Sequence, residues 1–143
     1  MQLTRHTDFS LRVLIYLSLN KTGELVTINE ISDHFDILKN HLTKVVHHLA
    51  QKKYIETVRG KNGGLRLARD PADIKLGDVV QSMEMNLDVV DCSKPLCPLI
   101  NNCKLKRILN KAKQSFLKTL NNYSLADLNN EPEIIKNLLH FPS

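Results

Sequence analysis

The sequence lacks any apolar run long enough to span a membrane. Its longest such stretch, from Leu11 to Leu19, contains Arg12 and Ser18 and falls short of the roughly 18 residues that a membrane helix needs. The pattern of a secretory signal, a charged segment followed by an apolar segment and a small-residue cleavage site, does not open the sequence. We therefore expect a cytoplasmic protein with no membrane partner.

Cysteine is scarce, with three residues at positions 92, 97 and 103. An odd number cannot complete a disulfide framework, and cytoplasmic thiols stay reduced. No histidine or asparagine forms an evident activating pattern with these thiols, so we expect no enzyme. Internal repeats and low-complexity tracts are absent. A length of 143 residues, of which 42% are hydrophobic and 24% charged, suits one compact domain with room for an appended arm.

Apolar residues at helical spacing predict a mainly α fold. The first such segment covers residues 8–20, with Thr7 or Asp8 as its N-cap. A capping-box pattern at 27–30 starts a second, short helix that ends near Phe35. A third helix, at 39–52, places its apolar residues on one stripe: Leu42, Val45, Val46 and Leu49. Two short helices joined by a tight turn predict a helix-turn-helix over about 28–51.

A small β-hairpin is predicted directly after these helices. The β-branched run at 54–59 and the segment 65–68 flank a connector that holds three of the five glycines. Within this connector, Asn62 and Gly63 supply the positive φ angles of a hairpin turn. A further helix is expected at 76–85. This order of elements predicts a winged helix-turn-helix domain over 1–85, with the wing at about 55–68.

Positive charge gathers on the third helix and the hairpin. Residues 39–69 include eight basic residues and one acid, a local excess of +7 against +5 for the whole chain. A solvated basic surface would explain charge alone, but its coincidence with a helix-turn-helix and a hairpin favours binding to double-stranded DNA. The candidates for contacts with base edges are Asn40, Thr43, Lys44 and His47. The candidates for the phosphate backbone or the minor groove are Lys52, Lys53, Arg59 and Lys61.

The cysteines lie in a predicted loop, residues 86–103, that we interpret as a metal-binding segment. Their C-x4-C-x5-C spacing lacks paired C-x-x-C knuckles and can wrap something larger than one ion, which favours an iron-sulfur cluster. A three-thiolate zinc site, a regulatory disulfide and separate reduced thiols remain alternatives. A cluster needs a fourth, non-cysteine ligand, for which the candidates are Asp8, His6, Asp88 and Asp91. We interpret the nearby His41, His47 and His48 as surface histidines.

A long helix is predicted from Cys103 to Asn121. Its apolar residues form a narrow stripe, and its other faces carry six cations and no acid. Such a stripe suits a seam between two helices better than a broad core face. The stripe comprises Leu105, Leu109, Ala112, Phe116 and Leu120. We therefore interpret 104–143 as a dimerisation helix followed by a C-terminal tail whose short helix is capped at Ser124.

Several segments together resemble a known family. They are residues 1–4, the wing sequence 58–67, residues 77–80 and residues 122–128, with the cysteine loop between the last two. The sequence resembles the nitric-oxide-sensing repressors of the iron-sulfur winged-helix superfamily that includes IscR. Members similar to IscR have a histidine ligand three residues after the third cysteine, where this chain has Lys106, and one more residue between the first two cysteines. Both departures favour the nitric-oxide branch.

The resemblance implies a homodimeric repressor of genes that protect against nitrosative stress. Its cluster-loaded form would bind an AT-rich inverted repeat and leave the operator when nitric oxide attacks the cluster. The resemblance also implies one 2Fe-2S or 4Fe-4S cluster per subunit, held by Cys92, Cys97 and Cys103, with Asp8 reaching across the dimer. Once released, Asp8 would pair with Arg12, its i+4 neighbour. A zinc-stabilised or thiol-redox winged-helix regulator without a cluster remains the alternative.

Overall fold

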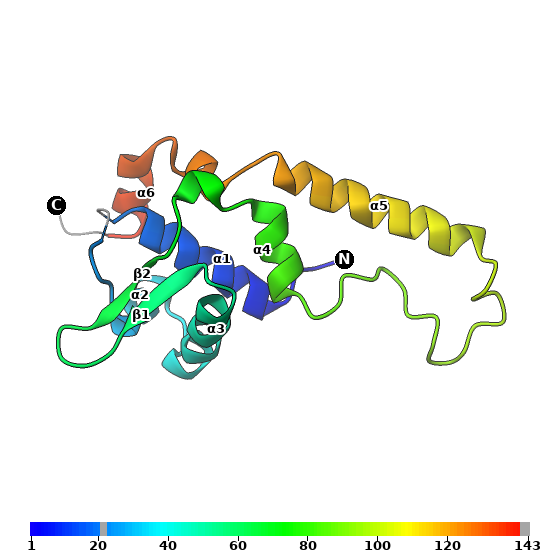
Figure 1. Ribbon diagram of the computed structural model, residues 1–143, viewed down its shortest axis with the longest axis horizontal. Helices are drawn as coiled ribbons and strands as arrows, with labels where there is room; N and C mark the ends of the chain where they lie inside the picture. The colour runs from blue at the N-terminus through cyan, green and yellow to red at the C-terminus, as the bar shows by residue number, and fades with distance from the viewer. Residues whose placement is uncertain (21–22, 141–143) are drawn as a thin grey trace.

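The computed structural model describes residues 1–20 and 23–140 (Figure 1). The elements in chain order are α1 (Arg5–Ser18), α2 (Ile28–Phe35), α3 (Lys39–Gln51), β1 (Ile55–Val58), β2 (Gly64–Leu67), the 3-10 turn η1 (Pro71–Asp73), α4 (Leu76–Met83), α5 (Lys104–Asn121), the 3-10 turn η2 (Leu125–Asn129) and α6 (Pro132–Leu138). The predicted mainly α fold with one small hairpin is confirmed. Residues 141–143 of the predicted tail lie outside the described residues.

The chain divides into a packed body and a projecting arm. We define the body as residues 1–20, 23–83 and 122–140, and the arm as residues 84–121, a long loop leading into α5 (Figure 1). The hydrophobic core lies in the body, where Leu14, Ile31 and Leu42 are fully buried. In the arm, all of which the structure describes, Leu117 is the single buried hydrophobic residue.

Helix α1 begins earlier than predicted. Its N-cap is Thr4, in extended conformation, whose hydroxyl accepts a hydrogen bond from the Thr7 amide at 3.4 Å. Thr7 has the same capping chemistry, but it is fully buried inside the first turn. The prediction of Thr7 or Asp8 as the cap is therefore wrong, because packing rather than local chemistry selects between the two threonines. Asp8 lies in the first helical turn, where the helix dipole favours a carboxylate.

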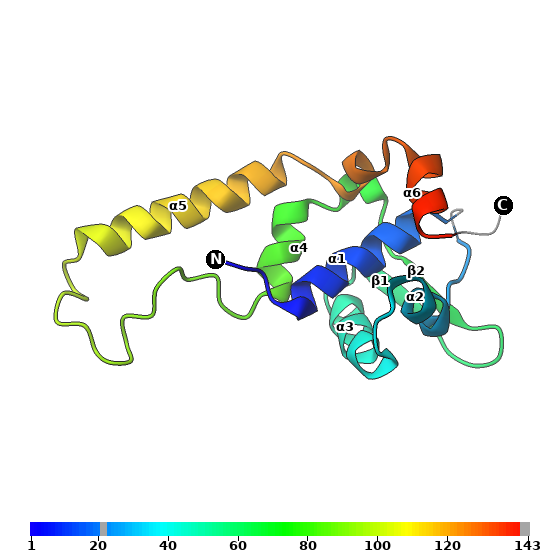
Figure 2. The same cartoon turned by 180° about the vertical axis from the view of Figure 1, so that it is seen from behind.

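The helix-turn-helix forms as predicted, between α2 and α3. The Thr27–Glu30 capping box starts α2, and Asp36 ends it with a left-handed φ of 52°. Ser32 braces the turn, because its hydroxyl donates to the Ile37 carbonyl at 2.6 Å while its own carbonyl accepts from the Ile37 amide at 3.2 Å. Both helices lie on one side of α1, with α5 on the other side (Figure 2). The recognition-helix position of α3 is thereby open to solvent.

The wing is a two-stranded antiparallel hairpin in which Ile55 pairs with Leu67 and Val58 with Gly64. Its tip projects on the same side of the body as α3 (Figure 1). The positive φ angles in the connection are at Gly60 (95°) and Asn62 (66°), so the prediction for Gly63 is wrong. Gly63 is needed for a different reason: a Cβ there would overlap the Val58 carbonyl oxygen.

The arm joins the body where α4 meets the end of α5. The Asn121 side chain accepts a hydrogen bond from the Asp78 amide at 3.0 Å, and a Cβ on Gly77 would overlap that side chain. Helix α4 ends at Met83 rather than at residue 85, and Met85 is fully exposed. Among the described residues, no helix is long and apolar enough to cross a membrane.

Candidate nucleic-acid interface and cysteine loop

Helix α3 presents one apolar and one polar face. Its apolar residues Leu42, Val45 and Leu49 are completely buried in the core. The four residues predicted to contact base edges are all exposed: Asn40, Thr43, Lys44 and His47. The Thr43 hydroxyl donates to the Lys39 carbonyl at 2.9 Å, so its proton is already held within the helix. This polar face has the size and chemistry for a nucleic-acid groove.

The four residues predicted to contact the phosphate backbone are exposed as well. Lys52 and Lys53 end α3, and Lys53 has a positive φ of 62°. Arg59 and Lys61 lie at the tip of the wing. Helix α3 and the wing tip project on the same side of the body (Figure 1).

Two of the eight basic residues in this region have structural partners instead. Arg66 pairs with Glu56 across the hairpin at 3.0 Å. Arg69 donates to the carbonyls of Lys52 and Lys53, at 2.9 and 3.0 Å, and stacks over the Tyr54 ring. Arg69 therefore fixes the backbone of the two lysines at the end of α3. The cross-strand pairing of Glu56 with Arg66 follows from the hairpin register, but nothing in the local sequence indicates the role of Arg69.

The histidines of α3 have different surroundings. His47 is exposed, but His48 is half-buried, and a hydrogen bond of 2.9 Å joins its Nδ1 to His6 Nε2 on α1. Burial, followed by the charges of His48 and His41, lowers the pKa of His6. His41 packs its ring edge against Phe9 of α1. The interpretation as surface histidines is therefore wrong for His41 and His48, which connect α3 to α1.

The three cysteines are free and half-buried in the arm. The Cys97 amide donates to the Cys92 carbonyl at 2.9 Å, which closes the loop between these two residues. Cys103 is the N-cap of α5, and its sulfur accepts a hydrogen bond from the Lys106 amide at 3.4 Å. The start of α5 therefore fixes the position of the Cys103 sulfur.

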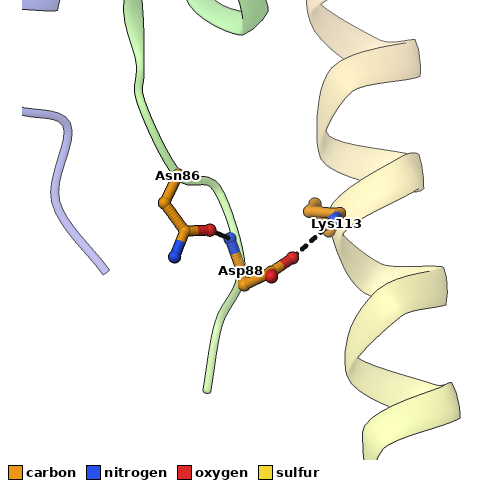
Figure 3. Close-up of polar contacts among 3 residues, drawn as sticks. All are labelled: Asn86, Asp88 and Lys113. Atoms are coloured by element: carbon orange, nitrogen blue, oxygen red, sulfur yellow. Dashed lines mark hydrogen bonds and ion pairs between the residues drawn. The ribbon is translucent and has the colours of Figure 1, made fainter. Parts of the chain in front are cut away.

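The candidates for a fourth ligand have other partners here. Asp8 forms an ion pair with Arg12 at 2.8 Å, and Asp88 pairs with Lys113 of α5 at 2.8 Å (Figure 3). Hydrogen bonds from the Ser93 hydroxyl and amide hold Asp91 and lower the pKa of its carboxyl group. Within the described ranges, no three side chains of His, Cys, Asp or Glu are gathered as a metal site.

The donor set nevertheless fits a thiolate-bound cluster. Three cysteines without disulfide bonds lie in one loop. A backbone hydrogen bond joins Cys92 and Cys97, and Cys103 lies at the N-terminus of α5. Exposed apolar side chains surround them, including Leu96 (70% exposed) and Leu99 (64%). A bound group and a second surface would both remove such side chains from water.

The apolar stripe of α5 is only partly covered. Leu109, Phe116 and Leu120 are half-buried, whereas Leu105 is 61% exposed. Leu117 and Ile108, which the predicted stripe omits, divide between two faces: Leu117 packs against the body and Ile108 is 54% exposed. Helix α5 therefore carries exposed apolar side chains at Leu105 and Ile108.

Comparison with known proteins extends this description. Residues 3–131 match the Rrf2 family, described as an iron-dependent transcriptional regulator. The HTH-type transcriptional regulator NsrR of Bacillus subtilis (strain 168) is 45% identical over 142 residues, which cover 97% of both chains. The predicted resemblance is therefore confirmed as a resemblance to NsrR-type regulators of the Rrf2 family.

Solved structures agree with the fold. IscR of T. potens matches 90% of this chain and 85% of its own, with a TM-score of 0.72 and 23% identity. A transcriptional regulator from Listeria innocua matches 92% of this chain and 88% of its own, with a TM-score of 0.76 and 19% identity. CymR of B. subtilis, titled a global cysteine regulator, matches 90% and 95%, with a TM-score of 0.67 and 20% identity. The winged helix-turn-helix architecture is therefore confirmed.

Proposed function

Because this chain belongs to the Rrf2 family of transcriptional regulators, we propose that it is a nitric-oxide-sensitive, iron-sulfur-dependent repressor of genes that protect against nitrosative stress. The chain is a DNA-binding regulator and not an enzyme. The observation that carries the finer proposal is the arm: three free cysteines in one loop, in a chain 45% identical to an NsrR over 97% of its length. We place its action in the cytoplasm, as a homodimer.

The arm supplies the residues for the cluster. Cys92, Cys97 and Cys103 bind one 2Fe-2S or 4Fe-4S cluster per subunit, and Asp8 supplies an oxygen ligand across the dimer. When bound, the cluster supplies an iron centre that nitric oxide attacks. The hydrogen bond from the Lys106 amide holds the Cys103 sulfur at the start of α5. Cluster binding is thereby connected to the position of the dimerisation helix.

The α3 face and the wing tip bind the operator, an AT-rich inverted repeat. Asn40, Thr43, Lys44 and His47 contact base edges in the major groove. Lys52, Lys53, Arg59 and Lys61 contact phosphates or the minor groove. Support comes from their common exposure on the side of the body where α3 and the wing tip project (Figure 1).

Helix α1 connects the two sites. Asp8 is in its first turn, and the His6–His48 hydrogen bond joins the same turn to α3. Arg12 competes for the Asp8 carboxylate, since it already holds that group at 2.8 Å. If Asp8 exchanged Arg12 for a cluster ligand role, the position of α1 would depend on that exchange, and operator DNA must favour the same position for the two sites to be coupled.

Air-excluded purification followed by iron and sulfide analysis tests this proposal. We expect iron and sulfide in the full-length protein, visible absorption that nitric oxide alters, and tight binding to promoter DNA that nitric oxide abolishes. Cys97→Ser should lose the absorption and the operator binding together, whereas the loop variant Asn101→Ala should keep both.

Two results would contradict the proposed iron-sulfur cluster. Colourless protein with one zinc per chain would replace it by a zinc-stabilised regulator. Unchanged operator binding by Cys97→Ser would remove the cluster from DNA recognition, and a reversible loss of binding on thiol oxidation would then indicate a thiol-redox regulator.

A further inference from the structure

Leu38 is an exposed apolar residue at the start of α3. It is 81% exposed, although Ile37 beside it is buried. Leu38 is the N-cap of the helix, and its carbonyl accepts hydrogen bonds from the amides of His41 and Leu42 at 3.0 and 3.1 Å. Ser, Thr, Asp and Asn are strongly preferred at an N-cap because their side chains bind a free backbone amide. A leucine forgoes that bond, so helix capping does not explain it.

The position of Leu38 at the start of the recognition helix explains the exposed leucine better than helix capping does. The first residues of a recognition helix are the ones that reach base edges in the major groove. Leu38 directly precedes Lys39 and Asn40, and Thr43 follows one turn later with its hydroxyl bound to the Lys39 carbonyl. The side chains of Leu38, Asn40 and Thr43 are therefore all exposed within the first two turns.

This combination suits A·T pairs. Thymine alone presents a methyl group in the major groove, and an apolar side chain is its usual contact, while asparagine pairs with adenine through N6 and N7. Cytosine would place an amino donor against Leu38 with no acceptor to satisfy it. The segment 37–55 carries four lysines and no acid, which matches a polyanion rather than a basic protein surface.

We propose that Leu38 is a specificity-determining residue that reads a thymine methyl group in each operator half-site, next to the adenine contacted by Asn40. This proposal rests on the DNA-binding part of the proposed function. It adds the base that the start of α3 selects and the residue that selects it.

Replacement of thymine by deoxyuridine, which removes only the methyl group, tests the proposal. Full-length, air-excluded protein first selects duplexes from a randomised library. Each thymine of the best duplex is then replaced in turn, and fluorescence anisotropy gives the dissociation constants for wild type and Leu38→Ala. At one thymine per half-site we expect about a fourfold loss for wild type, the worth of one buried methyl group. Leu38→Ala should bind thymine and deoxyuridine equally at that position.

Three variants serve as controls. Leu38→Met keeps an apolar side chain and should keep the discrimination, and Leu138→Ala, at an exposed leucine of α6, should change nothing. Leu38→Ser restores a capping hydroxyl, so it should raise the midpoint of thermal unfolding while it abolishes the discrimination. A purely structural role for Leu38 does not predict a higher unfolding midpoint together with a loss of discrimination between thymine and deoxyuridine.

The outcomes separate the two proposals. If the protein binds DNA while no thymine shows a deoxyuridine effect that disappears in Leu38→Ala, this inference alone is overturned. A uniform loss of affinity by Leu38→Ala at every duplex also overturns it, because it shows no base selection. Failure of iron-loaded and iron-free protein to select any duplex overturns both proposals.

Discussion

The body of this chain has a buried hydrophobic core, whereas the arm has a single buried hydrophobic residue, Leu117. In the body, Leu14, Leu42 and Leu125 are completely removed from water. In the arm, Leu96, Leu99 and Leu105 are each more than 60% exposed. Both regions contain leucine, so the type of residue does not explain the difference in exposure.

The difference indicates that the body is complete as a folding unit, while the arm is built to receive something. The arm is a loop and a single helix, held to the body by Leu117 and the Gly77–Asn121 contact. The Asp88–Lys113 pair joins the loop to the helix within the arm (Figure 3). A second subunit and a metal group, which we propose for α5 and the loop, would cover the surface that remains.

Truncation of a core leucine should give the largest effect. Leu42→Ala leaves a cavity in the body and should lower the free energy of unfolding by about 2–5 kcal/mol. Leu99→Ala removes an exposed side chain of the arm and should change it by less than about 0.5 kcal/mol. Urea denaturation of both variants, followed by circular dichroism, makes the measurement. Similar losses in the two variants would abolish the distinction between body and arm.

A charge on the α5 stripe should have the next largest effect. Leu109→Glu should convert the proposed dimer to a monomer and weaken operator binding about 100-fold, because two half-sites are no longer bound together. The body should keep its unfolding midpoint. Analytical ultracentrifugation and operator titration measure the two properties. Gln114→Glu adds the same charge to an exposed position outside the stripe and should leave the oligomeric state and operator binding unchanged. If Leu109→Glu is still a dimer, the α5 stripe is not the dimer interface.

A side chain at the joint between body and arm should have an intermediate effect. In Gly77→Ala the new Cβ would overlap the Asn121 side chain and lie 2.7 Å from the Leu117 carbonyl oxygen. We expect α4 and α5 to shift apart, at a cost of about 1–3 kcal/mol. Thermal unfolding measures this cost, with Gln81→Ala, an exposed site on α4, as the control. If Gly77→Ala unfolds at the same temperature as wild type, α4 and α5 can move apart without a cost in stability.

The smallest effect is expected for the Asp88–Lys113 ion pair (Figure 3). Asp88 is more than half exposed, and such surface pairs contribute about 0–1 kcal/mol. A double-mutant cycle with Asp88→Ala, Lys113→Ala and the double variant should therefore give a coupling energy in that range, falling at high salt. A coupling well above it would mean that the pair, rather than a bound group, organises the cysteine loop.

Local patterns were sufficient wherever one segment contains the whole signal. The Thr27–Glu30 capping box started α2 as predicted, and the apolar spacing of Leu42 and Leu49 correctly identified the buried face of α3. The glycine-rich connector correctly predicted a hairpin, although the positive φ angles fell on Gly60 and Asn62. The Asp8–Arg12 pair, expected from i+4 spacing, is present at 2.8 Å.

Predictions failed where two segments compete for one residue. Thr4 and Thr7 are equally able to cap α1, and only the burial of Thr7 against the rest of the body decides between them. His48 belongs to the polar positions of an isolated α3, yet it meets His6 of α1. Leu117 lies outside the apolar stripe of α5 because it faces the body and not a second helix.

The amino-acid sequence by itself determined the order of helices and wing, the basic character of α3 and the presence of three thiols in one segment. These features depend on backbone preferences and on charges that lie close along the chain. Tertiary structure alone decided which arginines are held by the body, which histidines join α1 to α3 and which leucines stay exposed. Each of these outcomes depends on a contact between residues far apart in sequence, and its energy exists only once packing has brought the two surfaces together.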